Sequence, residues 1–209
     1  MASVNGFTPT RNLEFRMGTN AILPRITLVR HGETEWAKAG KHTGRTDVPL
    51  TTTGEDAARK LPARLAGTTF SHVFTSPLSR AWRTCELAGF TGTVEPDVIE
   101  WNYGEYEGLT TAQIRDKRPD WDLFRDGCPG GESAAGIAVR VDRLVTKLKS
   151  LSGEVLLFAH GHILRVLASR WIGQPVGFAQ HLLLGTAAIS VLGFDHNHPD
   201  EPAIAKWNA

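Results

Sequence analysis

The chain has 209 residues, enough for one domain with a sizeable core, and its 41% hydrophobic and 22% charged residues are ordinary for a globular protein. Its net charge of +1 provides no global field that would favour nucleic acid or a membrane surface as a partner. The sequence contains no apolar run of the ~20 residues that a membrane helix needs. The two cysteines, Cys85 and Cys128, form no close pair or metal-type spacing, so we expect free thiols.

The first 24 residues differ from the rest because they contain no predicted strand or helix. We expect residues 1–24 to form a poorly ordered tail before a single domain over residues 25–209. The tail lacks the continuous apolar stretch of a secretion signal. Arg11 and Arg16 faintly resemble an organellar transit peptide, but Glu14 opposes that interpretation. We therefore expect a cytoplasmic location, and the sequence leaves the oligomeric state open.

The first half of the domain alternates between strand and helix patterns. The stretch "RITLV", residues 25–29, predicts a buried strand, and residues 50–67 predict a helix that Pro62 kinks or divides. Residues 71–90 begin as a strand and continue as a helix. A further short strand is predicted within residues 93–101.

Within residues 71–90, Ser76 precedes Pro77 at the change from strand to helix. Serine is a preferred residue before a helix, and proline is favoured in a helix's first turn. We therefore predict that these two residues cap and begin that helix.

The second half continues the alternation. Residues 110–133 predict a short helix followed by a loop, and apolar residues at helical spacing predict a helix over 134–150. Strands follow at 154–160 and 187–195, with a helix at 163–173 between them. Helices that alternate with apolar strands indicate a three-layer α/β/α sandwich with a mostly parallel central sheet.

Three strand ends carry residues that suit an anion. Arg30 and His31 follow the first strand, His160 and Gly161 follow another, and Arg80 lies just after a third. Ligands of open α/β sheets bind beyond the carboxyl ends of the strands. Each residue alone could equally be structural, but burying two cations and two imidazoles together is costly unless an anion joins them. Guanidinium groups suit phosphate oxygens, and a helix beginning near Gly161 would add backbone donors.

The first of these stretches, "LVRHGETEW", resembles the signature of the histidine phosphatase superfamily. That superfamily contains phosphoglycerate mutases, sugar bisphosphatases and broad acid phosphatases. The resemblance covers nearly the whole chain after residue 24 and continues in five further stretches: "HTGRTDVPLTTTGEDAA", "TSPLSRAWRT", "EWNYGEYEGLT", "CPGGES" and "FAHGHILR".

The resemblance implies a role for each matching residue. His31 matches the nucleophile that becomes a phosphohistidine, and Arg30, Arg80 and His160 match the residues that hold the phosphate oxygens. Glu100 matches the acid and base that protonates the leaving group and then activates water. The resemblance implies no metal and no cofactor, because the arginines supply the positive charge.

Further residues are candidate substrate contacts. Thr43 and the Gly44 backbone match a loop that touches the transferring phosphate, and Gly161 is expected to supply backbone donors. Tyr103 is a candidate contact and, with Trp101, a candidate apolar wall beside Glu100. Glu105 and Glu107 are rivals for the acid role, but the family match falls on Glu100, and we expect Glu107 to bind backbone or arginine partners.

Two positions depart from the pattern of many relatives. Ala37 replaces an asparagine, so one phosphate contact is missing or is supplied otherwise. His162 replaces a glycine and is either a packing or hydrogen-bonding residue or a third imidazole at the pocket mouth.

The branch with sedoheptulose-bisphosphatase-like enzymes and small acid phosphatases matches best. The chain lacks the longer insertions that cover the site in phosphoglycerate mutases, so we expect hydrolysis of a small phosphorylated metabolite, a sugar phosphate or bisphosphate. Lys38, Lys41 and Arg45 either hold a second anionic group or are solvated loop charges.

Other functions remain as alternatives. One is phosphoryl transfer of the mutase type, and another is a phospho-ligand-binding module without turnover, which the presence of His31 and Glu100 opposes. His196 and His198 form an incomplete metal site, and we expect them to be surface residues.

Overall fold

The computed structural model describes residues 22–209, so the predicted tail over residues 1–24 lies outside the described residues except for its last three. Six strands form one sheet in the order β3-β2-β4-β1-β5-β6. They span Arg25–Arg30 (β1), His72–Thr75 (β2), Thr93–Val94 (β3), Glu154–Ala159 (β4), Ile189–Phe194 (β5) and Pro202–Lys206 (β6).

The sheet is mixed, with a parallel majority. Strand β4 pairs in parallel with β1 and β2, and β2 pairs in parallel with β3. Strand β5 runs antiparallel to β1, and β6 runs antiparallel to β5. The prediction of a mostly parallel sheet is therefore confirmed, but the short edge strand β6 was not predicted.

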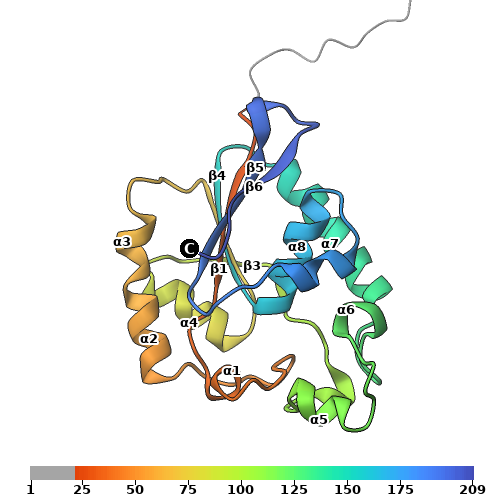
Figure 1. Ribbon diagram of the computed structural model, residues 1–209. Coiled ribbons are helices and arrows are strands. Elements are labelled where there is room, and N and C mark those ends of the chain that lie inside the picture. Colours follow the sequence, from red (N-terminus) through yellow and green to blue (C-terminus); the bar gives the residue numbers. More distant parts are fainter. Residues whose placement is uncertain (1–21) are drawn as a thin grey trace, which may run out of the picture.

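Helices cover both faces of the sheet, which gives the predicted three layers. Figure 1 shows α2, α3 and α4 on one side of the strands and α7 and α8 on the other. The α-helices span Glu35–Lys38 (α1), Thr52–Arg59 (α2), Leu61–Leu65 (α3), Ser79–Leu87 (α4), Thr111–Arg115 (α5), Leu123–Asp126 (α6), Ala134–Lys149 (α7) and Gly161–Trp171 (α8). Four short 3-10 helices span Pro96–Val98, Gly104–Tyr106, Val176–His181 and Asp195–Asn197.

Strands β1 and β4 are buried on both faces. Because successive side chains in a strand point to opposite faces, Leu28 and Leu157 pack into the larger apolar cluster with α7 and α8. Val29 and Phe158 pack into the smaller cluster with α2, α3 and α4. Because these two strands are buried between the two clusters, the residues directly after them start from a fixed position in the core.

The helix predicted over residues 50–67 is divided, as Pro62 indicated. Helix α2 ends at Arg59 and α3 begins at Leu61, so that Pro62 lies in the first turn of α3. Proline fits there because the first N–H groups of a helix have no partner within the helix.

The predicted cap of α4 was wrong. Helix α4 begins at Ser79 rather than at Pro77. The hydroxyl of Ser76 accepts a hydrogen bond from the Leu78 N–H and shares another with the His160 ring. The Ser76 side chain therefore binds the histidine at the end of β4 and does not cap α4.

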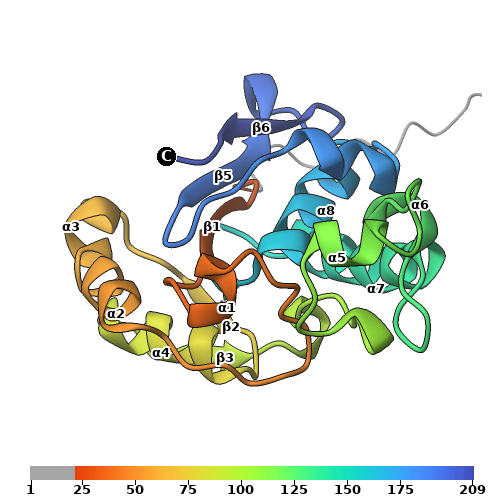
Figure 2. The ribbon, with the colours of Figure 1, turned by 60° about the horizontal axis from the view of Figure 1, so that its bottom comes forward.

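The carboxyl ends of β1 and β4 lie at one edge of the sheet. Figure 2 brings this edge forward and shows α1 over the end of β1. The chain passes closely here, because a Cβ atom added at Gly32 would lie 2.4 Å from the carbonyl oxygen of Gly54. Glycine is therefore required immediately after His31.

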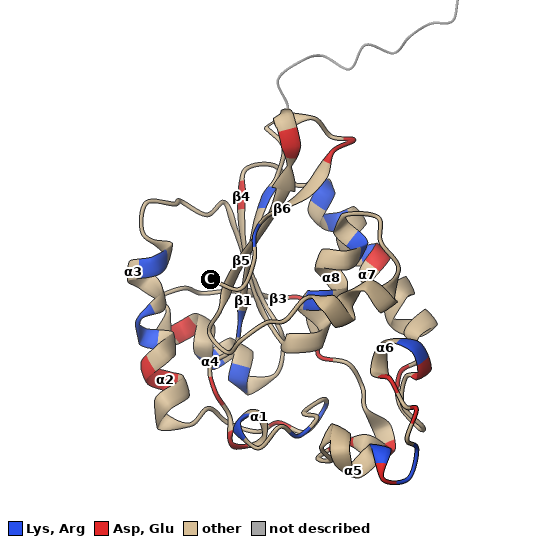
Figure 3. Cartoon of the chain, in the orientation of Figure 1, with Lys and Arg blue, Asp and Glu red and all other residues tan. Residues whose placement is uncertain are grey.

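The charged residues are mixed over the rest of the molecule. Figure 3 shows Lys and Arg interspersed with Asp and Glu along the helices, without a face of one sign in that view. None of the helices between residues 22 and 209 is long and apolar enough to cross a membrane. Cys85 and Cys128 are free and buried, as expected, and burial raises the pKa of each to about 12.

Candidate active site

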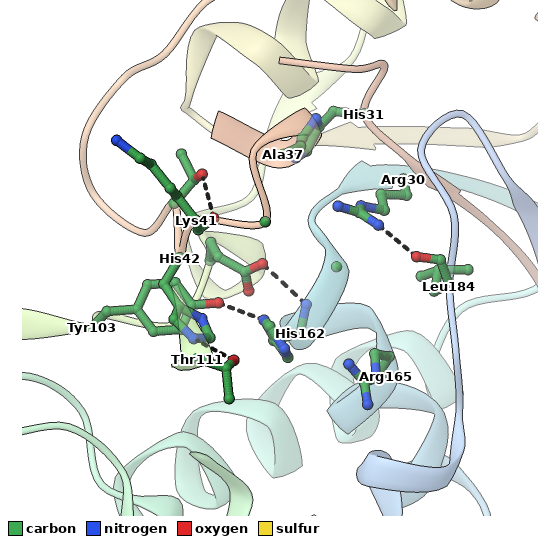
Figure 4. Close-up of a pocket in the computed structure, with 14 residues that line it drawn as sticks. Arg30, His31, Ala37, Lys41, His42, Tyr103, Thr111, His162, Arg165 and Leu184 are labelled. Carbon is green, nitrogen blue, oxygen red and sulfur yellow. Dashed lines mark hydrogen bonds between the residues drawn. The ribbon is translucent and has the colours of Figure 1, made fainter. Parts of the chain in front are cut away.

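A cavity of ≈ 240 Å³ opens at the carboxyl ends of β1 and β4. Figure 4 shows the side chains that line it, which come from the β1 end, α1 and the loop after it, the Glu100–Tyr103 segment, the start of α5, α8 and the loop before β5. The lining residues are Arg30, His31, Ala37, Gly40, Lys41, His42, Thr43, Glu100, Tyr103, Thr111, Gly161, His162, Arg165 and Leu184.

His31 is buried and its ring is fixed in one tautomer. Its Nδ1 lies 2.6 Å from the carbonyl oxygen of Gly32, which can only accept, so Nδ1 carries the hydrogen. Burial and the positive charges of Arg30 and Arg80 lower the pKa of His31 well below its ordinary value. The imidazole is therefore neutral, and its Nε2 has a free lone pair, as a nucleophile requires.

Arg80 and His160 lie beside His31 but do not line the cavity. The His31 and His160 rings are 5.2 Å apart between centroids. Arg80 is fully buried; its Nε donates to His160 Nδ1 at 3.0 Å. The two terminal nitrogens of Arg80 donate to the carbonyl oxygens of Thr43, Gly44 and Thr46.

His160 is consequently a neutral ring as well. Because Nδ1 accepts from the arginine, Nε2 carries the hydrogen and donates to Ser76 Oγ at 2.7 Å. Burial, together with the positive charges of Arg80 and Arg30, lowers its pKa well below the ordinary value. The structure brings this predicted pair to the nucleophile, and their contact with phosphate oxygens stays a prediction.

Arg30 lines the cavity and retains unused hydrogen-bonding capacity. Its Nη1 donates to the Leu184 carbonyl oxygen at 2.5 Å. Its Nε is the one buried side-chain nitrogen or oxygen without a hydrogen-bond partner among residues 22–209. A Cβ at Gly161 would lie 3.3 Å from the guanidinium, so the glycine lets α8 approach the arginine closely.

Glu100 is buried at the N-terminus of α8. Its Oε1 accepts from the backbone N–H groups of Trp101 and Ile163, and its Oε2 accepts from that of His162 at 3.0 Å. Oε2 has one such donor and therefore keeps a free acceptor position. Of the three glutamates considered for the acid role, only Glu100 lines the cavity.

The predicted apolar wall beside Glu100 is half present. Trp101 packs into the core and donates its ring N–H to the Glu132 carbonyl, whereas Tyr103 lines the cavity with Glu100. The Tyr103 hydroxyl and His162 Nδ1 share a hydrogen bond of 2.5 Å. His162 thus combines both roles left open for it, because it packs against Tyr103 and also lines the cavity.

The loop after α1 is held by Glu107 and Arg80. Thr43 lines the cavity, but Gly44 does not; the Gly44 N–H donates to Glu107 at 2.7 Å. Glu107 also accepts from the N–H groups of Arg45 and Thr46. Glu107 thus binds backbone partners, one of the two kinds of partner expected for it. Ala37 does line the cavity, where it contributes only a methyl group.

Of the three basic residues expected at the mouth, Lys41 lines the cavity and Lys38 and Arg45 do not. Sequence reasoning missed Arg165, which lines the cavity and holds the Ala179 and Gln180 carbonyl oxygens. A signal existed, since Arg165 follows Gly161 by four residues and so shares its helix face.

His42 and Thr111 were also missed. The His42 ring packs at a tilt against Tyr103, with ring centroids 4.8 Å apart, and its Nε2 lies 3.2 Å from the Thr111 hydroxyl. Their positions follow from a contact between loops that are distant in sequence, which no local pattern reveals.

His196 and His198 are exposed and distant from this cavity, as expected. His196 lies with Asp195 and Glu201 in an exposed acidic cluster. No feature of this cluster connects it with the cavity.

Comparisons with known proteins define the class. Residues 26–209 match the sequence model of the histidine phosphatase superfamily (branch 1), so the chain belongs to that family. Phosphatases of this family hydrolyse phosphoric monoesters, and the chain is such an enzyme.

Two curated relatives and one solved structure place the chain further. It is 42% identical to an acid phosphatase of Mycobacterium tuberculosis over 178 residues, 82% of this chain and 87% of the relative. It is 31% identical to a sedoheptulose 1,7-bisphosphatase of Saccharomyces cerevisiae, over 88% of this chain and 92% of the relative. A solved Mycobacterium tuberculosis structure superposes with a TM-score of 0.84 at 39% identity, covering 88% of this chain and 96% of that one.

His42 makes stability depend on pH. Burial lowers its pKa to about 4, whereas an unfolded histidine titrates near 6.5. Between these values the unfolded state binds more protons, so the free energy of unfolding falls as the pH falls from 6.5 to 4, by about 3 kcal/mol for this group. Urea unfolding across this range should show a shallower dependence in His42→Gln than in the wild type. Equal slopes would contradict the assignment; His198→Gln is the control at an exposed position.

Proposed function

We propose that the protein is a metal-independent phosphomonoesterase that hydrolyses small phosphorylated metabolites, sugar phosphates or bisphosphates, through a phosphohistidine on Nε2 of His31. The observation that carries this proposal is the hydrogen bond from His31 Nδ1 to the Gly32 carbonyl. It directs the lone pair of a neutral imidazole to the attacking nitrogen. The relatives named acid phosphatase and sedoheptulose 1,7-bisphosphatase support the same chemistry.

In the first step, Nε2 attacks phosphorus and the bond from phosphorus to the ester oxygen breaks. Arg30, with its unpaired Nε, balances charge on the phosphoryl oxygens. Arg80 and His160 support the step from behind His31, where the Arg80 charge helps to keep both rings neutral. The leaving oxygen takes a proton from Glu100, whose Oε2 keeps the free acceptor position described above.

In the second step, Glu100 removes a proton from water, the water oxygen attacks phosphorus and the nitrogen–phosphorus bond breaks. Inorganic phosphate leaves and His31 returns to its neutral form. Gly40 lines the cavity and is exposed, which supports access of water to the phosphohistidine. Hydrolysis is therefore favoured over transfer to a second metabolite.

The cations lining the cavity support a substrate with two anionic groups. Arg30 serves the transferring phosphate, and Arg165 and Lys41 also line the cavity. Arg165 donates through Nε and Nη2 to carbonyl oxygens, and its Nη1 has no acceptor among residues 22–209. Thr43, His42, Thr111, Tyr103 and His162 offer hydroxyl and imidazole groups that suit the hydroxyls of a sugar.

Steady-state hydrolysis tests the nucleophile. Without added metal, the wild type should hydrolyse p-nitrophenyl phosphate and members of a panel of sugar phosphates and phosphoglycerates, and His31→Ala should lose activity by about 10³-fold or more. Denaturing quench with labelled substrate should trap an acid-labile label that is absent from His31→Ala and present in the His198→Ala control. Retained activity in His31→Ala, or interconversion of phosphoglycerates without release of phosphate, would overturn the proposal.

Glu100→Gln separates the two proton transfers. Because p-nitrophenolate leaves without a proton, the variant should release a burst of p-nitrophenol and then turn over about 10²- to 10⁴-fold more slowly than the wild type. Stopped-flow absorbance measures the burst, and thermal unfolding checks that the capped end of α8 is intact. Glu105→Gln is the matched control. Unchanged steady-state turnover in Glu100→Gln would exclude its role as base.

Arg165→Met and Lys41→Met test the second anionic group. Loss of one charged hydrogen bond should lower kcat/KM for a sugar bisphosphate by about tenfold or more and leave that for the corresponding monophosphate within about twofold. Arg59→Met, on the exposed surface of α2, is the control. Equal kcat/KM of the wild type for mono- and bisphosphorylated sugars would remove the support for this substrate class.

A further inference from the structure

The position of Arg30 depends on a loop that follows the 3-10 helix at Val176–His181. This loop, residues 182–188, provides the Leu184 carbonyl that accepts from Arg30 Nη1 at 2.5 Å, as Figure 4 shows. The same loop holds the end of β1, because the Ala187 N–H lies 3.1 Å from the carbonyl oxygens of both Arg30 and His31. The Ala188 carbonyl accepts from the Arg30 N–H at 3.2 Å.

The loop has a local conformation that needs support from outside. Ala187 has a φ of 53°, which a residue with a Cβ atom rarely adopts. Leu183 is 71% exposed, whereas Leu184 is buried and packs into the larger apolar cluster. That packing fixes the Leu184 side chain, and further contacts at its two neighbours hold the backbone of the loop against Arg30.

The last three residues of the chain supply those contacts. The Trp207 ring N–H donates to the Leu183 carbonyl at 2.6 Å, and the Gly185 N–H donates to Asn208 Oδ1 at 2.7 Å. The two residues that flank Leu184 are thus each fixed by one hydrogen bond to the same segment. Leu184 itself keeps its carbonyl for the guanidinium.

This segment is anchored to the sheet. Ala209 and Ile189 exchange two backbone hydrogen bonds, of 2.9 and 3.0 Å. The Asn208 N–H donates to Ser190 Oγ, and Arg64 donates to the carbonyl oxygens of both Ala187 and Ala209. The Trp207 ring packs against the larger apolar cluster. The support is therefore continuous from the core to Leu184.

We infer that residues 207–209 position the phosphate-binding guanidinium of Arg30 through the loop at Leu184, and that Trp207 and Asn208 are positioning residues for the reaction. Neither side chain lines the cavity. This inference rests on the proposed role of Arg30 in holding the phosphoryl oxygens. Its consequence is that a change remote from the cavity lowers phosphate binding and turnover together.

The double variant Trp207→Phe/Asn208→Gly tests the inference. Phenylalanine lacks the ring donor, and glycine removes the side-chain acceptor while tolerating the φ of 53° at position 208. We expect kcat/KM for p-nitrophenyl phosphate to fall about tenfold and the inhibition constant of inorganic phosphate to rise. The matched control is Trp82→Phe/Asn197→Gly, which alters an exposed tryptophan and an asparagine with the same φ of 53°.

A double-mutant cycle with Arg30→Gln separates positioning from a general structural role. If the segment acts through Arg30, the double variant should cost less than about twofold when residue 30 is glutamine. An equal loss in both backgrounds, or no loss with arginine present, overturns the inference. If Arg30→Gln itself has wild-type activity, the proposed role of Arg30 fails instead.

Single variants keep the test decisive if the double variant does not fold. Asn208→Asp keeps the acceptor and should retain wild-type kcat/KM, whereas Asn208→Gly should show part of the loss. Equal activities of these two variants would also overturn the inference.

Discussion

Arg80 is buried and Arg30 is half-buried, and neither forms a salt bridge with a carboxylate among residues 22–209; much of the site follows from that constraint. Their side-chain hydrogen bonds go to carbonyl oxygens and to one imidazole, all of them neutral acceptors. A charge in the interior is costly. Glu100 lies near enough to act favourably on both guanidinium groups, but no direct ion pair neutralises either, so two such cations at one sheet edge favour an anionic ligand. Burial, together with the same charges, lowers the pKa values of the neighbouring His31 and His160. In the proposed mechanism, the two arginines thus contribute both to affinity for phosphate and to an unprotonated nucleophile.

The orientation of that nucleophile is set by the backbone rather than by an acidic partner. In many catalytic histidines a carboxylate fixes the tautomer, but here the Gly32 carbonyl accepts from Nδ1. The peptide carrying this carbonyl is held by close approach to Gly54 and by the Gly32 N–H, which donates to Thr84 Oγ1. The hydrogen bond to this neutral carbonyl raises the pKa of the ring, but less than burial and the two arginines lower it. The tautomer is thus fixed without cancelling the effect of the arginines.

The parts of the fold that rest on hydrophobic pattern could be predicted from sequence. Strands β1 and β4 are continuous apolar runs, and α7 has apolar residues at helical spacing. The structure confirms all three predicted elements. Strand β6 was missed because its five residues, "PAIAK", lie at a sheet edge where no strong pattern is required. Ser76 was misassigned because its local preference for a cap competes with a bond to His160.

The residues of the candidate site likewise fall into those that the sequence could predict and those that it could not. Residues at the ends of strands could be placed together because parallel strands bring their carboxyl ends to one edge. Arg165 could have been found from its spacing along α8. His42 and Thr111 depend on the bridge between Lys41 and Thr110, and the engagement of Arg80 by three carbonyls depends on how the 43–46 loop folds. Such long-range contacts leave no periodic trace in a single sequence.

Sheet direction explains why the end of the chain reaches this site at all. Because β5 runs antiparallel to β1, its first residue pairs with Val29 and the loop before it arrives at the edge where β1 ends. Because β6 in turn runs antiparallel to β5, its last residue, Lys206, pairs with Val191 and the chain leaves the sheet at that same edge. A fully parallel sheet would place the start of β5 at the opposite edge, away from Arg30. The two antiparallel strands thus bring both the Leu184 carbonyl and the residues that hold it to the guanidinium.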